Sequence, residues 1–174
     1  MTTVVLSVTG SDRPGLTQAL AQAVLSAGGN WLQSHLSRLG GLYVGSVLVE
    51  LPDGNVDALL RAVGDQHAQG LDVRIVGARP DHEPSGETVR FSVVGQDRPG
   101  IVHQVTAVLS GLQVNIEDLD SSLTAEPHSG APLFRMDARL RLPPGMAAER
   151  VQQALEGISA EIMVDVTVGA PGKS

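Results

Sequence analysis

Hydrophobic and polar residues alternate near the start of the chain, and the same alternation returns in its second half. The hydrophobic positions of this pattern are Val4, Leu6 and Val8, and then Val89, Phe91 and Val93. A period of two residues is typical of a β-strand with one buried face. Hydrophobic residues then recur with helical spacing over residues 16–27 and 101–112. Each half is therefore predicted to open with a strand followed by a helix.

The remaining elements of each half also follow one order. A short strand begins at Asn30 or Asn115, and Pro52 or Pro143 ends a third strand. The hydrophobic face of this third strand is clearest in the second half, at Phe134, Met136, Ala138, Leu140 and Leu142. The second helices are expected near 56–63 and 151–158, and the last strands near 73–75 and 162–166. The order β-α-β-β-α-β predicts an α+β protein with ferredoxin-like modules, in which two helices cover one face of each antiparallel sheet.

The two halves are copies of one unit. The segment from Val8 to Leu16 returns 85 residues later as Val93 to Ile101, with six of nine positions identical. This periodicity predicts two modules in tandem rather than one domain. The predicted boundaries are 1–77 for the first module, 78–88 for a linker rich in Pro, Gly and charge, 89–168 for the second module, and 169–174 for a disordered tail. The second module carries six extra residues before its third strand, expected as a surface loop at 126–132.

The repeated turn between the first strand and the first helix is the candidate functional site. Its residues are Asp12, Arg13, Pro14, Gly15 and Leu16, and then Asp97, Arg98, Pro99, Gly100 and Ile101. The first N–H groups of a helix lack intrahelical partners, so a carboxylate or phosphate is stabilised there. The glycines would let a small ligand approach the backbone. Asn30 and Asn115 are expected near the same end of the sheet, where an amide could bind a zwitterion or lock a loop.

A purely structural role for this turn is equally compatible with the residues. Asp12 could cap the helix, and Pro14 could preset its first turn. Gly10 and Gly95 could simply permit a tight turn. Recurrence does not separate the two interpretations, because a duplicated architecture also duplicates its turns.

The sequence resembles an ACT domain, and the resemblance covers both units. It rests on a Gly-x-Asp-Arg-Pro-Gly-Leu turn that is followed by a helix and then by Gly-Gly-Asn, within the order β-α-β-β-α-β. It implies a regulatory module that binds a small amino acid where modules meet. Two such modules without an enzyme are similar to the glycine cleavage system transcriptional repressor family. That similarity implies contact with a protein partner such as a transcriptional activator, a response to glycine, and a homo-oligomer. The turn residues with Asn30 and Asn115 would then form or frame the sites, although Gln18 stands where the second unit has His103.

Composition narrows the remaining function classes. The formal net charge is −7 and there is no cysteine, which argues against a nucleic-acid surface and excludes cysteine-based sites. The five histidines show no metal-ligand spacing, and no nucleophile has a visible base. We therefore expect no metal, no cofactor, no catalysis and no membrane segment, in a cytoplasmic protein. An RNA-binding module with the same element order stays as an alternative, with Tyr43 and a basic stripe as its only support, and so does an interaction module without a ligand.

The outer face of the first unit is less polar than that of the second. Leu42, Val44 and Leu48 are predicted to face away from the helices, where the second unit has Arg135 and Arg139. Trp31 begins the neighbouring strand. These residues could be buried against another module or subunit, or Trp31 could pack at the edge of its own sheet.

Overall fold

The computed structural model describes residues 1–67, 70–79, 85–125, 130–158 and 162–168. The chain divides into two compact units, Met1–Asp81 and His82–Ser174, which we call module 1 and module 2. The predicted tail at 169–174 and residues 126–129 of the predicted loop lie outside the described residues. Among the described residues, no helix is long and apolar enough to cross a membrane.

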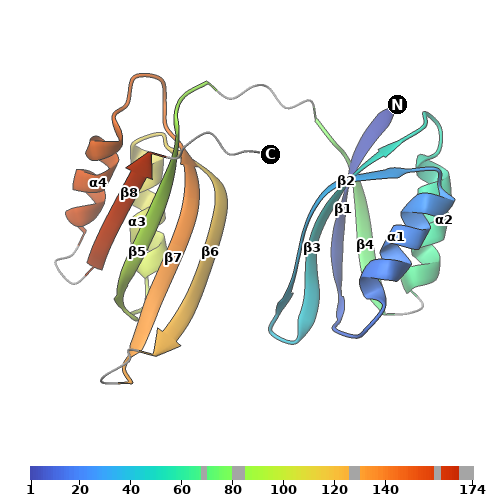
Figure 1. The fold of residues 1–174 in the computed structure, drawn as a ribbon, viewed down its shortest axis with the longest axis horizontal. Coiled ribbons are helices and arrows are strands. Elements are labelled where there is room, and N and C mark those ends of the chain that lie inside the picture. Colours follow the sequence, from blue (N-terminus) through green and yellow to red (C-terminus); the bar gives the residue numbers. More distant parts are fainter. Residues whose placement is uncertain (68–69, 80–84, 126–129, 159–161, 169–174) are drawn as a thin grey trace. The chain divides into compact units, whose positions relative to one another are not determined.

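Both modules have the predicted β-α-β-β-α-β order, and the α+β fold class is confirmed (Figure 1). Module 1 contains β1 (Thr2–Ser11), α1 (Leu16–Ser26), β2 (Asn30–Leu39), β3 (Leu42–Leu51), α2 (Val56–His67) and β4 (Leu71–Gly77). Module 2 contains β5 (Thr88–Gln96), α3 (Ile101–Gly111), β6 (Asn115–Ala125), β7 (Pro132–Arg141), α4 (Ala148–Glu156) and β8 (Ile162–Val168). Thr88, assigned to the linker from the sequence, already belongs to β5.

Each module has one antiparallel four-stranded sheet. The strand order is β2-β3-β1-β4 in module 1 and β6-β7-β5-β8 in module 2. The first strand of each module is therefore central, and β2 and β6 each form an edge. An edge strand leaves backbone N–H and C=O groups available for pairing with another chain.

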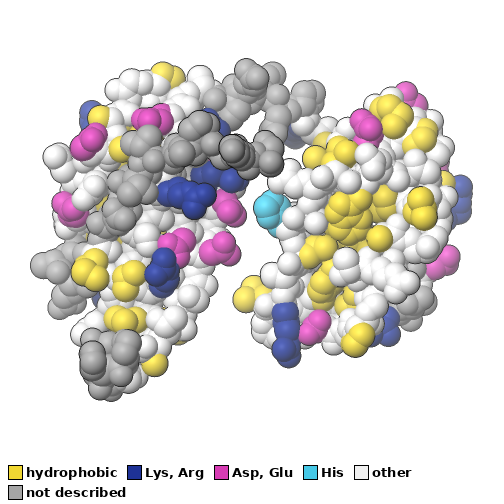
Figure 2. Space-filling view, in the orientation of Figure 1, with side chains coloured by type: hydrophobic (Ala, Val, Ile, Leu, Met, Phe, Trp, Pro, Cys, Tyr) yellow, Lys and Arg dark blue, Asp and Glu magenta, His cyan; other side chains and the backbone are white. Residues whose placement is uncertain are grey.

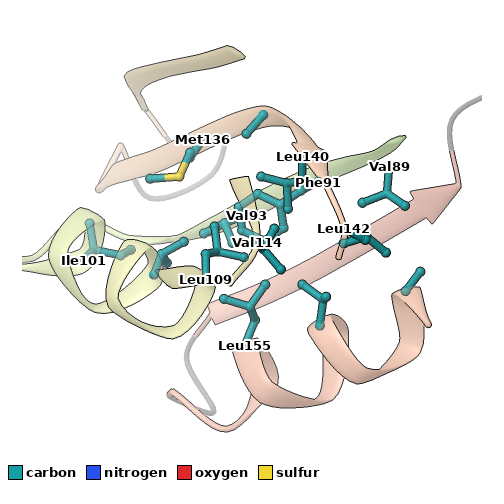
Figure 3. Close-up of a cluster of buried hydrophobic side chains, with 14 of the residues drawn as sticks. Val89, Phe91, Val93, Ile101, Leu109, Val114, Met136, Leu140, Leu142 and Leu155 are labelled. Atoms are coloured by element: carbon teal, nitrogen blue, oxygen red, sulfur yellow. The ribbon is translucent and has the colours of Figure 1, made fainter. Parts of the chain in front are cut away.

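The helices bury the hydrophobic face of each sheet, and each module has its own core. In module 1, Leu6, Leu20, Val49 and Leu59 are among the fully buried side chains. In module 2, the corresponding cluster joins the strands to α3 and α4, with Phe91 at its centre (Figure 3). The alternation predicted for β7 is confirmed, because every second residue from Phe134 to Leu140 is buried. Burial of one such side chain stabilises the fold by about 1.5–3 kcal/mol.

The structure decides between the two placements left open for Trp31 and favours packing on its own module. Trp31 lies opposite the buried Val49 in the β2·β3 pairing, and directly opposed residues share one face of a sheet. Its ring packs against the core of module 1 on the helix side. Trp31 therefore does not belong to the outer apolar face, whereas Leu48 opposes the outward-facing Gln33 as predicted.

Candidate ligand-binding turns

The turn into the first helix has the same backbone geometry in both modules. Gly15 precedes α1 with φ 91° and ψ −6°, and Gly100 precedes α3 with φ 88° and ψ 1°. These are left-handed conformations, which cost an L-residue about 1–2 kcal/mol. An added Cβ would have nothing within 4 Å at either position. The fold therefore needs glycine here for the backbone conformation and not for lack of space.

No side chain caps α1 or α3, and neither helix has an acidic residue in its first turn. The expectation that Asp12 caps the helix is wrong. Its carboxylate instead contacts Arg38 at the end of β2, with 3.0 Å between Oδ2 and Nε. The surface from Asp12 to Gly15 is exposed. The first turn of α1 thus presents uncapped backbone donors, with a positive helix end, on an exposed part of the molecule.

Each turn is held against the neighbouring hairpin by a backbone hydrogen bond. The Asp12 N–H donates to the Gly41 carbonyl at 3.4 Å, and the Asp97 N–H donates to the Pro132 carbonyl at 3.1 Å. These contacts fix the end of the central strand beside the hairpin that follows it. The turn is therefore built by the sheet as well as by its own sequence.

Side chains around the two turns differ. In module 1, the hydroxyls of Thr17 and Tyr43 are 2.7 Å apart and tie the first turn of α1 to β3. In module 2, the guanidinium of Arg98 donates to the side-chain carbonyl of Gln104 at 2.7 Å. Thr17, Arg38 and Gln104 were not predicted to lie beside the turns. For Thr17 a signal was present in the repeat, because module 2 has Val102 at this position and Phe134 at the position of Tyr43.

Asn30 and Asn115 lie at the opposite end of the sheet from the turns of their own modules, contrary to expectation. Asn30 opposes Glu50, which in turn opposes Thr3 at the beginning of β1. The turn follows Ser11, eight residues further along β1 than Thr3, so the separation is about 26 Å at the usual rise of ~3.3 Å per residue. The physical reason is chain direction: the helix runs back along the sheet before β2 begins.

The same separation holds in module 2, where Asn115 opposes Arg141 and Arg141 opposes Thr88. Asn115 instead lines a cavity of about 550 Å³ with Thr106, Ser110 and Gln113. The turn residues and the asparagine of one module therefore cannot touch the same small ligand. Among the described residues, no group of three His, Asp or Glu side chains is arranged to hold a metal ion.

Comparison with known proteins gives a match to one family model, described as the ACT domain, over residues 2–76 and 87–169. The chain is 25% identical over 163 residues to the glycine cleavage system transcriptional repressor of Escherichia coli (strain K12), covering 91% of this chain and 85% of that protein. It is 31% identical over 176 residues to phosphoserine phosphatase SerB2 of Mycobacterium tuberculosis (strain ATCC 25618 / H37Rv), covering 95% of this chain but only 40% of that enzyme. The crystal structure of an unknown protein from Galdieria sulphuraria superposes with a TM-score of 0.84 at 28% identity, covering 97% and 99% of the two chains.

Proposed function

Because the chain belongs to the ACT domain family, we propose that it is a non-catalytic regulatory protein that binds a small amino acid at its strand–helix turns. Glycine is the first ligand to test, since a relative covered over 85% of its length is a glycine cleavage system transcriptional repressor. Binding would change the affinity for a protein partner such as a transcriptional activator. Such coupling is typically worth ~1–3 kcal/mol.

The observation that carries this proposal is the uncapped start of α1 and of α3 behind an exposed left-handed glycine. An amino-acid carboxylate would accept hydrogen bonds from the free N–H groups and interact favourably with the positive helix end. The proposed contact residues are Asp12, Arg13, Pro14, Gly15 and Leu16 in module 1, and Asp97, Arg98, Pro99, Gly100 and Ile101 in module 2.

Asn30 lies too far from the turn of its own module to join the site there, so it would have to join a site formed by another copy of the module. Antiparallel pairing of two β2 edge strands would bring each Asn30 to the level of the partner's Leu39, at the turn end of that sheet. The amide would then supply donors and an acceptor to the ligand's ammonium and carboxylate groups. In this proposal the protein acts as a homo-oligomer in the cytoplasm, and ligand and assembly are coupled.

The RNA-binding alternative is weakened by the environment of its basic stripe. Arg139 and Arg141 contact Glu117 at 3.3 and 2.8 Å, and Arg135 contacts Asp137 at 2.6 Å. A surface whose arginines are paired with carboxylates is a poor electrostatic footprint for phosphates. Salt-sensitive retardation of RNA by the full chain would nevertheless favour this alternative.

The decisive experiment is thermal unfolding of the full chain with glycine, L-serine and L-valine, followed by fluorescence. Trp31 is the single tryptophan and packs on the core of module 1, so its signal reports that module. A ligand at ~100-fold its Kd adds ~2.7 kcal/mol, equivalent to roughly 10–20 °C for a module of this size. No shift with any of the three amino acids would count against the sensor function.

Gly15→Ala identifies the site, and Gly54→Ala is its matched control. Gly54 has a similar φ of 87°, is exposed, and has nothing within 4 Å of an added Cβ. Both variants should lose about the same stability, but only Gly15→Ala should lose the amino-acid response seen by Trp31. An unchanged response in Gly15→Ala would mean that the turn is structural. A partner affinity that is the same with and without every amino acid would instead favour an interaction module without a ligand.

A further inference from the structure

The helix-free faces of the two sheets differ in chemistry. In module 1 this face includes Leu42, Val44 and Leu48. In module 2 the outward positions of the three strands β6, β7 and β5 include both acidic and basic residues, and Figure 2 shows acidic and basic side chains intermingled on this module. Charged residues on an exposed sheet face are ordinary in themselves. In module 2, however, the pairing of these charges and the shape of the surface that they line are unusual.

The face of module 2 is hollowed into a cavity of about 420 Å³. Its polar lining is Arg90, Ser92, Asp118, Asp120, Asp137 and Arg139. These residues come from three adjacent strands, so their backbones are fixed by the sheet rather than by a loop. A cavity of this size is within the range of sites for small molecules.

Like charges face each other in two neighbouring rows of this cavity. Arg90 directly opposes Arg139 in the β5·β7 pairing, and Asp120 directly opposes Asp137 in the β6·β7 pairing. Directly opposed like charges destabilise a sheet. The fold obtains no packing in return, because these side chains point away from the core. Arrangements that break a local rule in this way are typical of functional sites.

Ion pairs with neighbouring residues neutralise only some of these four charged side chains. Glu117 lies 3.3 Å from Arg139, and Asp118 directly opposes Arg139 in the β6·β7 pairing. Arg135 holds Asp137 through two hydrogen bonds of 2.6 and 3.0 Å. The guanidinium of Arg135 lowers the pKa of Asp137, which keeps that carboxylate charged. Within the described part of the chain, neither Asp120 nor Arg90 forms an ion pair. Asp118 likewise forms no ion pair in this part of the chain, so Arg90 is left as a cationic group and Asp118 and Asp120 as anionic groups on the lining of the cavity.

We propose that the helix-free face of module 2 is a second binding site, for a small zwitterion whose ammonium and carboxylate groups are separated by several bonds. Arg90 and Arg139 would bind the carboxylate, and Asp120 and Asp137 would bind the ammonium group. The two rows are two residues apart along the strands, which corresponds to about 6.7 Å. An α-amino acid, with both charges on one carbon, is too short to span them. The site is therefore separate from the turns in both position and ligand length.

Calorimetric titration of the full chain with 5-aminopentanoate tests this proposal. Pentanoate and pentylamine are the single-charge controls, and glycine is the short control. We expect saturable binding of 5-aminopentanoate, weakened about tenfold or more in Arg90→Gln and in Asp120→Asn, because a lost charged hydrogen bond commonly has an effect of this size. Arg150→Gln, an exposed arginine on α4, should bind like the unmodified protein.

Unfolding in urea without ligand gives a second, independent measurement. Since each variant removes one member of a like-charge pair, Arg90→Gln and Asp120→Asn should unfold at the same or a higher urea concentration than the unmodified protein. The glycine response of the turns should persist in both variants, so failure of one proposal is distinguishable from failure of the other. Absence of 5-aminopentanoate binding at millimolar concentration, or equal binding of pentanoate or pentylamine, would overturn the proposal.

Discussion

Because each module has its own hydrophobic core, we expect the two modules to unfold independently. Two matched substitutions, each of which creates a cavity in one core, test this prediction. Leu59 on α2 and Leu155 on α4 have no exposed surface, and each belongs to the core of its own module. Replacement of a fully buried leucine by alanine costs about 3 kcal/mol, from lost transfer free energy and from the cavity left behind. For a module of this size the midpoint of thermal unfolding should fall by roughly 12–24 °C.

The assay follows unfolding of the same samples by Trp31 fluorescence and by far-UV circular dichroism. Leu59→Ala should lower the midpoint seen by Trp31 and split the circular dichroism transition into two steps. Leu155→Ala should leave the Trp31 midpoint unchanged while it lowers the other part of the circular dichroism transition. If Leu155→Ala lowered the Trp31 midpoint as much as Leu59→Ala does, the two modules would form a single cooperative unit, which would contradict independent unfolding.

Two further predictions concern single positions. Gly45→Ala should destabilise module 1 by about 1–3 kcal/mol or more, because the added Cβ would lie 1.9 Å from the carbonyl oxygen of His35 on the neighbouring strand. Urea unfolding followed by Trp31 fluorescence measures this loss. A loss below ~0.5 kcal/mol would show that β2 is free to move. Hydrogen bonds from Arg135 and Ser92 lower the pKa of Asp137 below its usual value near 3.8. The charged carboxylate therefore contributes to the free energy of unfolding above that pH, and this contribution is lost as the pH falls through the lowered pKa. The stability difference from Asp137→Asn, measured by circular dichroism, should therefore be largest near pH 6 and shrink towards pH 3, and a constant difference would contradict this assignment.

The modular organisation and the order of the elements were predictable from the sequence alone. A period of two residues marks the strands, helical spacing marks the helices, and recurrence of the Asp-Arg-Pro-Gly turn at a fixed offset marks the duplication. These signals are local, since a residue's face depends on its position along its own element. The burial of alternate residues from Phe134 to Leu140 followed directly from this pattern. The resemblance to ACT domains rested on the same local motif and is confirmed by the match over both modules.

Which residues come into contact depends on how the elements pair and pack. The pairing register separates Asn30 from the turn of its own module, because α1 carries the chain back across the sheet before β2 begins. A bulge between Trp31 and Gln33 shifts the β2 register, so Trp31 faces the core while Gln33 faces outward. Asp12 contacts Arg38, distant in sequence, and leaves the helix uncapped. Strand register and cross-strand contacts are properties of paired elements, so no pattern within one element could reveal them.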